Sequence, residues 1–248
     1  MYRVAVVTPY YKEERSVLAQ CHESVLRQSY QCDHILVADG FPSDLFEDVP
    51  NTLHVKLPKE NNDFGNTPRA IGGILAEAYG YDAVAYLDGD NWFESSHIES
   101  LIAAHEKTRA PLVCCKRTFC GLDGVRMDIT EPAEDANRHV DSSCWLIFRP
   151  AYSLLRDWLM PKILGPVGDR IFLQKAIHDR FRITPTMDRT VCYRTQHAHH
   201  YRLAGMAVPP GAKTANDILN KVNRHLSTRE GAREIVSALG FYPIISAR

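Results

Sequence analysis

The chain has 248 residues, with 29 basic and 30 acidic side chains, so its formal net charge is −1. Hydrophobic residues make up 45% and charged residues 24% of the sequence, which is typical of a globular protein and excludes global disorder. The near-zero charge argues against nucleic acid as a partner but is compatible with a small basic pocket for phosphates.

The seven cysteines are scattered and form no C-x-x-C pair, so we expect neither a zinc knuckle nor a disulfide framework. The sequence runs from Met1 straight into apolar residues, without the regions of a signal peptide. No stretch approaches the ~18 apolar residues of a membrane-spanning helix. We therefore expect a reduced, cytoplasmic protein without a transmembrane segment.

Strands and helices alternate in the first half of the sequence. Apolar runs and helical spacing predict strands at 3–9, 34–38, 53–57 and 82–87, and helices at 13–28, from 67 and from 95 to about 107. Thr67 and Pro68 are typical of a helix start, because Thr can cap and Pro suits the first turn. The alternation predicts an α/β fold with a largely parallel sheet, whose ligands bind beyond the carboxyl ends of the strands.

The second half is less regular. It predicts strands at 112–116, 143–148 and 189–194, and helices at 150–160, 169–178, 214–226 and 228–239. The segment 208–211 contains two prolines and a glycine and breaks the pattern. We expect one domain at 1–204 and a helical C-terminal appendage at 205–248, packed on that domain. The apolar stripes of its two helices fit docking on the domain or a homodimer interface.

Two carboxylates, Asp88 and Asp90, flank Gly89 directly after the strand predicted at 82–87. Hard divalent cations such as Mg²⁺ or Mn²⁺ prefer oxygen ligands of this kind. A metal there could bridge a diphosphate and neutralise charge on a leaving group. The alternative is an ordinary surface turn, since Asp and Gly are common turn residues.

Seven segments in order resemble the nucleotide-diphosphate-sugar glycosyltransferases of the GT-A fold, close to glycosyltransferase family 2. The resemblance runs over roughly residues 3–200 and rests on 4–11, 23–30, 34–40, 66–72, 88–90, 143–149 and 168–173. Ala38 replaces the first of two acidic residues usual in that family, and Pro68 and Ala70 depart from its helix-start motif. The resemblance implies a GT-A-like, Rossmann-like fold with a mixed, mostly parallel sheet flanked by helices.

The resemblance also implies a nucleotide-sugar site. Thr8, Pro9 and Tyr10 would line the nucleoside pocket, and Asp39 would accept a hydrogen bond from the base. Arg69, at a helix start where backbone donors point outward, suits a diphosphate. The alternatives are a turn residue for Asp39 and a solvated surface side chain for Arg69.

By the same resemblance Asp88 would contact the ribose or the metal and Asp90 would bind the metal, Mn²⁺ or Mg²⁺. A histidine could complete this site. His197 and His199 follow a predicted strand and would share one face if that strand continued, with His200 as a third candidate. Histidines that serve only structure are the alternative.

Asp169 is the candidate general base, which would take the proton of an acceptor hydroxyl as its oxygen attacks the anomeric carbon. A single displacement of this kind inverts the anomeric centre, although retaining chemistry stays open. The alternative for Asp169 is a helix N-cap. Trp92 and Trp145 are candidates for the acceptor side of the site, with core packing as the alternative.

These features predict a metal-dependent, inverting glycosyltransferase that moves a sugar from a nucleotide-diphosphate sugar to a hydroxyl acceptor. A UDP-sugar is favoured as donor because Asp39 is present. The alternatives are a degenerate GT-A protein that binds a nucleotide without turnover, and a D-x-D phosphatase. The phosphatase motif should open the first strand and continue with Thr or Val, whereas Asn91 follows here. A nucleotidyltransferase should have a Gly-rich loop after the first strand, and 8–13 contains no glycine.

Overall fold

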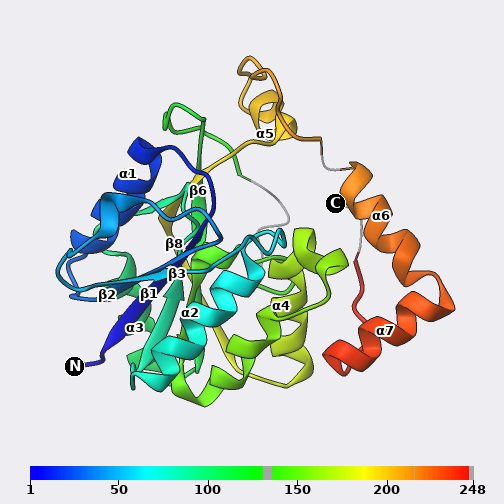
Figure 1. Cartoon of the computed structure of the whole chain (residues 1–248), viewed down its shortest axis with the longest axis horizontal. Helices are drawn as coiled ribbons and strands as arrows, with labels where there is room; N and C mark the ends of the chain where they lie inside the picture. The colour runs from blue at the N-terminus through cyan, green and yellow to red at the C-terminus, as the bar shows by residue number, and fades with distance from the viewer. Residues whose placement is uncertain (131–135, 215, 246–248) are drawn as a thin grey trace.

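A computed structural model of the chain describes residues 1–130, 136–214 and 216–245, excluding the side chains of 216–218. Within these residues an eight-stranded mixed sheet runs through the molecule in the order β3-β2-β1-β4-β7-β6-β8-β5 (Figure 1). The strands are β1 (Val4–Tyr10), β2 (Asp33–Ala38), β3 (Thr52–Lys56), β4 (Ala83–Tyr86), β5 (Trp92–Phe93), β6 (Leu112–Cys120), β7 (Trp145–Phe148) and β8 (Ile183–Arg194).

The strands β3, β2, β1 and β4 are parallel, as the alternating pattern predicts. Every residue of β1 is buried, because helices cover both faces of this half of the sheet. The register pairs Tyr10 with Ala38 and Val7 with Tyr86. The carboxyl ends of β1, β2 and β4 therefore meet at one edge, which brings Asp39 and Asp88 close to the end of β1.

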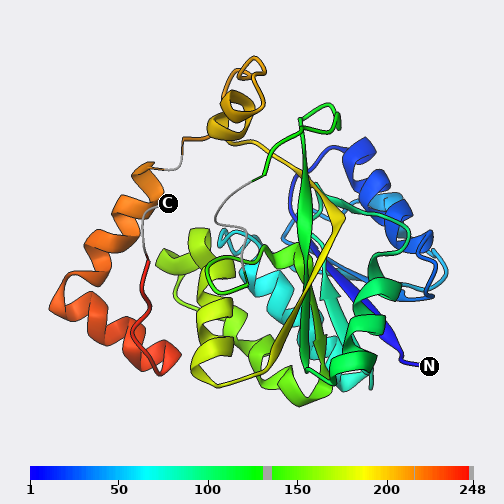
Figure 2. The same ribbon diagram turned by 180° about the vertical axis from the view of Figure 1, so that it is seen from behind.

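Helices cover both faces of the sheet. They are α1 (Arg15–Leu26), α2 (Asn66–Ala78), α3 (His97–Thr108), α4 (Gly168–His178), α5 (Ala198–Leu203), α6 (Asn216–Leu226) and α7 (Arg229–Leu239), with the 3₁₀ segments η1 (Asp44–Phe46), η2 (Ser142–Cys144), η3 (Arg149–Trp158) and η4 (Lys162–Val167). Figure 1 shows α2 and α4 in front of the sheet, and Figure 2 shows α1 and α3 on the opposite face. The observed architecture confirms the predicted fold class.

The start of α2 differs from the prediction. The helix begins at Asn66, after Gly65 in the left-handed conformation, and Thr67 does not cap it. Instead, Asp63 Oδ2 accepts hydrogen bonds from Thr67 N at 2.9 Å and from Thr67 Oγ1 at 2.5 Å. The Asp63 carboxylate thus accepts a hydrogen bond from a backbone N–H group of the first turn, a position at which acidic groups stabilise a helix.

The second half of the sheet is antiparallel in part, since β7 runs against both β4 and β6. Both β6 and β8 are longer than predicted, and the short β5 was not predicted. The helix expected at 150–160 is present at 149–158, as a 3₁₀ helix. The buried residues Tyr152, Leu155 and Trp158 are three positions apart and so share one face of a helix with three residues per turn.

The C-terminal helices α6 and α7 form a hairpin beside η4 and α4 (Figure 1). Val222, Leu226, Ile235 and Leu239 are buried and belong to the same apolar cluster as the sheet. The predicted stripes therefore pack on the body of the chain, while the homodimer and the boundary after residue 204 stay predictions. No helix among the described residues is long and apolar enough to cross a membrane.

The close approach of α2 to the sheet gives a stability prediction. A Cβ at Gly72 would collide with Val7 Cγ1 and lie 3.1 Å from Val37 Cγ2. We expect Gly72→Ala to lower the free energy of unfolding by about 1–3 kcal/mol, because the helix must shift. Urea denaturation measures the change. Ser237→Ala, at an exposed position of α7, should stay within about 0.5 kcal/mol of the parent chain. Equal stability of the two variants would contradict the tight packing of α2 on β1.

Candidate functional site

A cavity of about 530 Å³ opens at the carboxyl edge of the sheet. Residues from β1, the loop before α2, the loop after β4, the start of α4 and the end of β8 line it. Of the site residues predicted from sequence, the cavity brings together Pro9, Tyr10, Asp39, Arg69, Asp88, Asp90, Asp169 and His197. Segments far apart in the chain, from Pro9 to His197, thus meet where the strand order predicts a ligand site.

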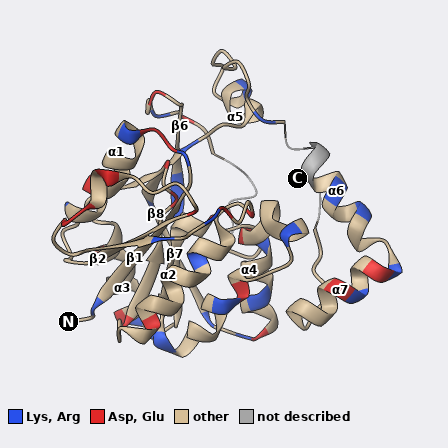
Figure 3. Cartoon of the chain, viewed as in Figure 1, with Lys and Arg blue, Asp and Glu red and all other residues tan. Residues whose placement is uncertain are grey.

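The described residues that line the cavity are rich in charge, with more acidic than basic side chains. The seven carboxylates are Glu13, Asp39, Asp63, Asp88, Asp90, Asp141 and Asp169, and the five Lys and Arg side chains are Arg69, Arg117, Arg170, Arg194 and Lys213. In Figure 3 acidic and basic segments lie next to each other around this edge of the sheet. An anionic ligand would therefore need a further cation to balance the excess of carboxylates.

Asp88 is held by three neighbours. Its Oδ1 pairs with Arg69 Nη2 at 2.6 Å, and its Oδ2 accepts a hydrogen bond from Ser142 Oγ at 3.0 Å. Its backbone N–H donates to Ser143 Oγ at 3.1 Å. The side chain is 29% exposed. Asp88 is thus fixed by α2 on one side and by η2 on the other.

Arg69 is buried at 4% exposure in the first turn of α2. Its Nη1 donates to Asn66 Oδ1 at 2.9 Å, and its guanidinium lies over the Trp158 ring, 4.6 Å from the centroid. Arg69 is therefore not a solvated surface side chain. Its position on the cavity wall fits the predicted contact with a diphosphate, although part of its charge is already matched by Asp88.

The carboxylate of Asp90 is buried among other negative charges. Loss of hydration raises the pKa of Asp90 to about 7, and the negative charges of Asp88, Glu13 and Asp141 act in the same direction, with Arg194 opposing them. Arg194 Nε donates to the backbone oxygen of Asp90 at 3.0 Å, not to its carboxylate. The carboxylate of Asp90, whose Oδ2 lies 3.4 Å from Gln196 Nε2, is thus incompletely compensated, and a divalent cation would stabilise its ionised form.

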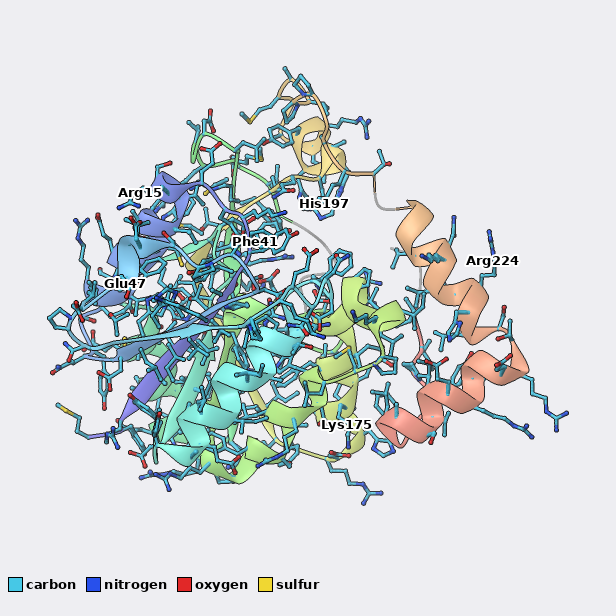
Figure 4. The ribbon with its side chains drawn as sticks, in the orientation of Figure 1. Arg15, Phe41, Glu47, Lys175, His197 and Arg224 are labelled. Atoms are coloured by element: carbon cyan, nitrogen blue, oxygen red, sulfur yellow. The ribbon has the colours of Figure 1, made fainter. Side chains whose placement is uncertain are left out.

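The histidines are not arranged as predicted. Residues 197–199 do not continue a strand, because α5 begins at Ala198 with His197 as its N-cap. Thr195 Oγ1 accepts a hydrogen bond from His197 N at 3.0 Å and bonds His200 Nδ1 at 2.6 Å, and these local bonds close a turn. His197 lines the cavity, beneath α5 in Figure 4, whereas His199 does not.

No three His, Cys, Asp or Glu side chains among the described residues lie close enough together to form a complete metal site. The part of the chain that the structure describes can therefore offer a metal at most one or two ligands from this set. That number suits Mg²⁺ or Mn²⁺ bound mainly through phosphate and water oxygens. Asp90 and His197 are the residues of the predicted set that line the cavity and fit this role, with Asp88 occupied by Arg69 and Ser142.

The residues predicted to bind the nucleoside lie in different surroundings. Asp39 is buried, and its Oδ1 accepts hydrogen bonds from Asn61 N at 3.0 Å and from Asn61 Nδ2 at 2.7 Å. The Tyr10 ring is 3% exposed, and its hydroxyl is engaged by His54 at 2.7 Å. Thr8 is a correction, because it is fully buried away from the cavity wall with its hydroxyl 2.8 Å from His34 Nε2.

The two tryptophans are not placed at the acceptor side. Trp145 is fully buried in β7 and packs on Phe172, so its core alternative is the correct one. Trp92 in β5 lies under the Arg194 guanidinium, 5.1 Å from the ring centroid, and is not among the described residues that line the cavity. Trp92 therefore supports Arg194, which in turn holds the backbone at Asp90.

Asp169 lies in the first turn of α4 and lines the cavity with 25% of its side chain exposed. Its Oδ1 accepts a hydrogen bond from Arg170 N at 2.7 Å, and its Oδ2 lies 2.5 Å from His139 Nε2. Burial alone would raise the pKa of Asp169, but the charge and hydrogen bond of His139 and the nearby Arg170 outweigh it, and the pKa is lowered below its usual range. Asp169 is therefore an ionised carboxylate that faces the cavity.

The profile of the family described as "Glycosyl transferase family 2" matches residues 5–181, which is more than half of the chain. The chain belongs to glycosyl transferase family 2. The family accounts for the order of the predicted motifs and makes the chain a glycosyltransferase. No curated protein sequence matches the chain.

Solved structures support the GT-A fold of this family 2 chain. The crystal structure of residues 1–349 of S. aureus TarS in complex with UDP has a TM-score of 0.61 and 14% identity, covering 96% of this chain and 70% of that one. The same fragment in complex with UDP-GlcNAc has a TM-score of 0.61 and 15% identity, covering 96% and 80%. At this identity the likeness shows the fold.

The sequence predictions included Ser143, in the motif 143–149, but missed the segment 139–142, which joins it at the site of this family 2 enzyme. His139 contacts Asp169, Asp141 pairs with Arg117 Nη1 at 2.9 Å, and Ser142 and Ser143 hold Asp88. The available signal was a run of polar residues directly before an apolar strand. These side chains are buried, and buried polar groups require partners.

The buried pair Arg117–Asp141 gives a prediction. Both side chains are at most 9% exposed, so Asp141→Asn would leave the Arg117 charge poorly compensated. We expect a loss of about 3–5 kcal/mol in the free energy of unfolding, measured by urea denaturation. Asp44→Asn is the matched control, because Asp44 pairs with Arg15 on the exposed surface, and it should leave stability unchanged. Similar behaviour of both variants would show that the buried pair does not support the site.

Proposed function

We propose that the chain transfers a sugar from a UDP-sugar to a hydroxyl acceptor with inversion, that a divalent cation assists, and that Asp169 is the general base. The observation that carries the proposal is the position of an ionised Asp169 on the wall of the same cavity that holds Asp39, Arg69 and Asp90. The general base Asp169, the cationic Arg69 for the phosphates and the carboxylate of Asp90 for the metal thus line the same cavity.

The charge balance of the cavity supports a metal-assisted reaction. Its described lining has more carboxylates than Lys and Arg side chains, and a diphosphate would add negative charge. Asp90, with His197 as a second candidate, would hold Mn²⁺ or Mg²⁺ while phosphate oxygens complete the coordination. When bound, the cation would neutralise charge that develops on the departing diphosphate. Arg69, held at the start of α2, adds fixed positive charge on that side.

Asp169 would act on the acceptor. The carboxylate takes the proton of the acceptor hydroxyl while the oxygen forms a new bond to the anomeric carbon and the bond from that carbon to the diphosphate breaks. The electron pair of the broken bond leaves on the diphosphate, so charge is conserved. Attack and departure occur on opposite sides of the anomeric carbon, which inverts its configuration.

The choice of UDP rests on two observations. Asp39 lines the cavity and is oriented by Asn61, so its carboxylate can accept a hydrogen bond from the N–H of a uracil-type base. The structurally similar TarS fragment has been crystallised with UDP and with UDP-GlcNAc. Two outcomes of the tests below would favour the alternatives. Nucleotide binding without donor cleavage would indicate a degenerate transferase, and no nucleotide binding would favour the phosphatase.

Nucleotide binding tests the donor site. We expect UDP to bind the chain in the presence of Mn²⁺ and to bind at least about tenfold more weakly in EDTA, measured by titration calorimetry. GDP and dTDP should bind more weakly than UDP. Asp90→Asn should remove the difference between Mn²⁺ and EDTA, whereas the exposed Asp44→Asn should preserve it. Equal binding of UDP in Mn²⁺ and EDTA would contradict the cation, and stronger binding of another nucleotide would contradict UDP.

Asp169→Asn tests the base. We expect release of UDP from UDP-GlcNAc, with Mn²⁺ present and water as acceptor, to fall by about 10²–10⁴-fold, because the amide cannot take the proton. The affinity for UDP should not change, since Asp169 acts on the acceptor. Anomer-resolved NMR should show the sugar released first with the configuration opposite to that of the donor. Normal turnover by Asp169→Asn would exclude it as the base, and retained configuration would exclude the single displacement.

A further inference from the structure

A buried histidine contacts the candidate base. His139 is 3% exposed, and its Nε2 lies 2.5 Å from Asp169 Oδ2. Its Nδ1 has no hydrogen-bond partner among the described residues. The contact with Asp169 is thus the polar interaction that the described structure provides for this ring. A buried imidazole without a second partner is costly unless the first interaction compensates it.

The exposed fractions of the two side chains differ. The Asp169 side chain is 25% exposed toward the cavity, whereas that of His139 is 4% exposed. An acceptor hydroxyl can therefore reach the carboxylate more easily than the imidazole. His139 also lines the cavity, on the segment that leads into η2, but its ring is almost fully covered, so Asp169 is the more accessible of the two groups.

We propose that His139 is a positioning residue, which donates Nε2–H to Asp169 Oδ2, fixes the orientation of the carboxylate and keeps it ionised for the reaction. The inference rests on the proposed function of Asp169 as general base. With Oδ2 held by His139 and Oδ1 held by Arg170 N, both carboxylate oxygens are anchored. Each oxygen still has a lone pair free to accept the proton of the acceptor.

The surroundings explain why the carboxylate needs this partner. Asp141 lies close enough that its own pKa is raised by burial and by the charges of Asp88 and Asp169, with Arg117 opposing them. Arg170 on α4 is the other positive group that acts on Asp169. A buried carboxylate beside another carboxylate would tend to take up a proton and lose its function as a base. The imidazole prevents this, and the lowered pKa of Asp169 agrees with that role.

The first experiment measures the ionisation of Asp169 without any substrate. Carboxyl ¹³C NMR of Asp-labelled protein is recorded against pH, and the Asp169 signal is identified by its loss in Asp169→Asn. We expect Asp169 to titrate about 1–3 pH units higher in His139→Ala than in the parent chain. His139→Gln, whose amide donates a neutral hydrogen bond, should give a smaller shift. The control His105→Gln changes a histidine at the end of α3, outside the described cavity lining, and should give none.

The second experiment measures UDP release from UDP-GlcNAc with Mn²⁺ across the same pH range. The base must be ionised, so activity falls as pH decreases through the pKa of Asp169. His139→Ala should move this acid limb to higher pH by the shift seen in NMR and lower kcat, while the affinity for UDP stays unchanged. His139→Gln should restore part of the rate.

The outcomes are distinguishable. An unchanged Asp169 titration in folded His139→Ala would overturn the inference, as would an NMR shift without any change in the acid limb. Absence of donor cleavage by the parent chain, together with the NMR shift, would overturn the proposed function while supporting the action of His139 on Asp169. Because the NMR titration needs no turnover, it separates the two.

Discussion

The structure of the site depends on the crowding of carboxylates at the carboxyl edge of a buried sheet. Like charges that are removed from water repel one another and favour protonation, unless a cation or a donor lies beside each of them. Three carboxylates have such a partner in the chain: Asp88 has Arg69, Asp141 has Arg117 and Asp169 has His139. Each partner comes from a different element, so the charges link α2, β6 and the segment 139–143 to one cavity.

Asp90 differs from these three carboxylates, because no ion pair is seen for it among the described residues. Arg194 is close, yet its Nε donates to the Asp90 backbone oxygen, and the raised pKa of Asp90 reflects the incomplete compensation. A buried carboxylate that is only partly compensated destabilises the folded protein, and a cation bound beside it would offset that cost. Under the proposed function, a ligand that brings a cation together with a diphosphate would supply the missing compensation.

Much of the fold and part of the site could be predicted from sequence. The apolar run of β1 and the polar residues after β2 and β4 place Asp39 and Asp88 at one edge, because parallel strands end on the same side. The cavity confirms this placement. Asp169 could be located only through the family resemblance, since no local pattern distinguishes a base from a helix N-cap.

The wrong predictions have two physical causes. Strand alternation put His197 and His199 on one face, but the Thr195 hydroxyl bonds the following backbone and starts a helix instead. Thr8 and Trp145 have side chains that could bind ligands, yet both occupy strands that are buried on both faces. For the histidines a local hydrogen bond of Thr195 decides the backbone, whereas for Thr8 and Trp145 tertiary packing decides the environment of the side chain.

His139 belongs to a segment whose place in the site could not be predicted from its local sequence. The segment before β7 contributes His139, Asp141, Ser142 and Ser143 to the site, although its sequence is typical of a polar loop. Its partners lie between 24 and 55 residues away in the chain. Each of the four buried polar side chains needs a hydrogen-bond partner. These partners lie at the sheet edge and at the start of α4, so the loop can be buried only when those elements are formed. The polar network at the cavity is therefore a condition of the fold as well as its functional centre.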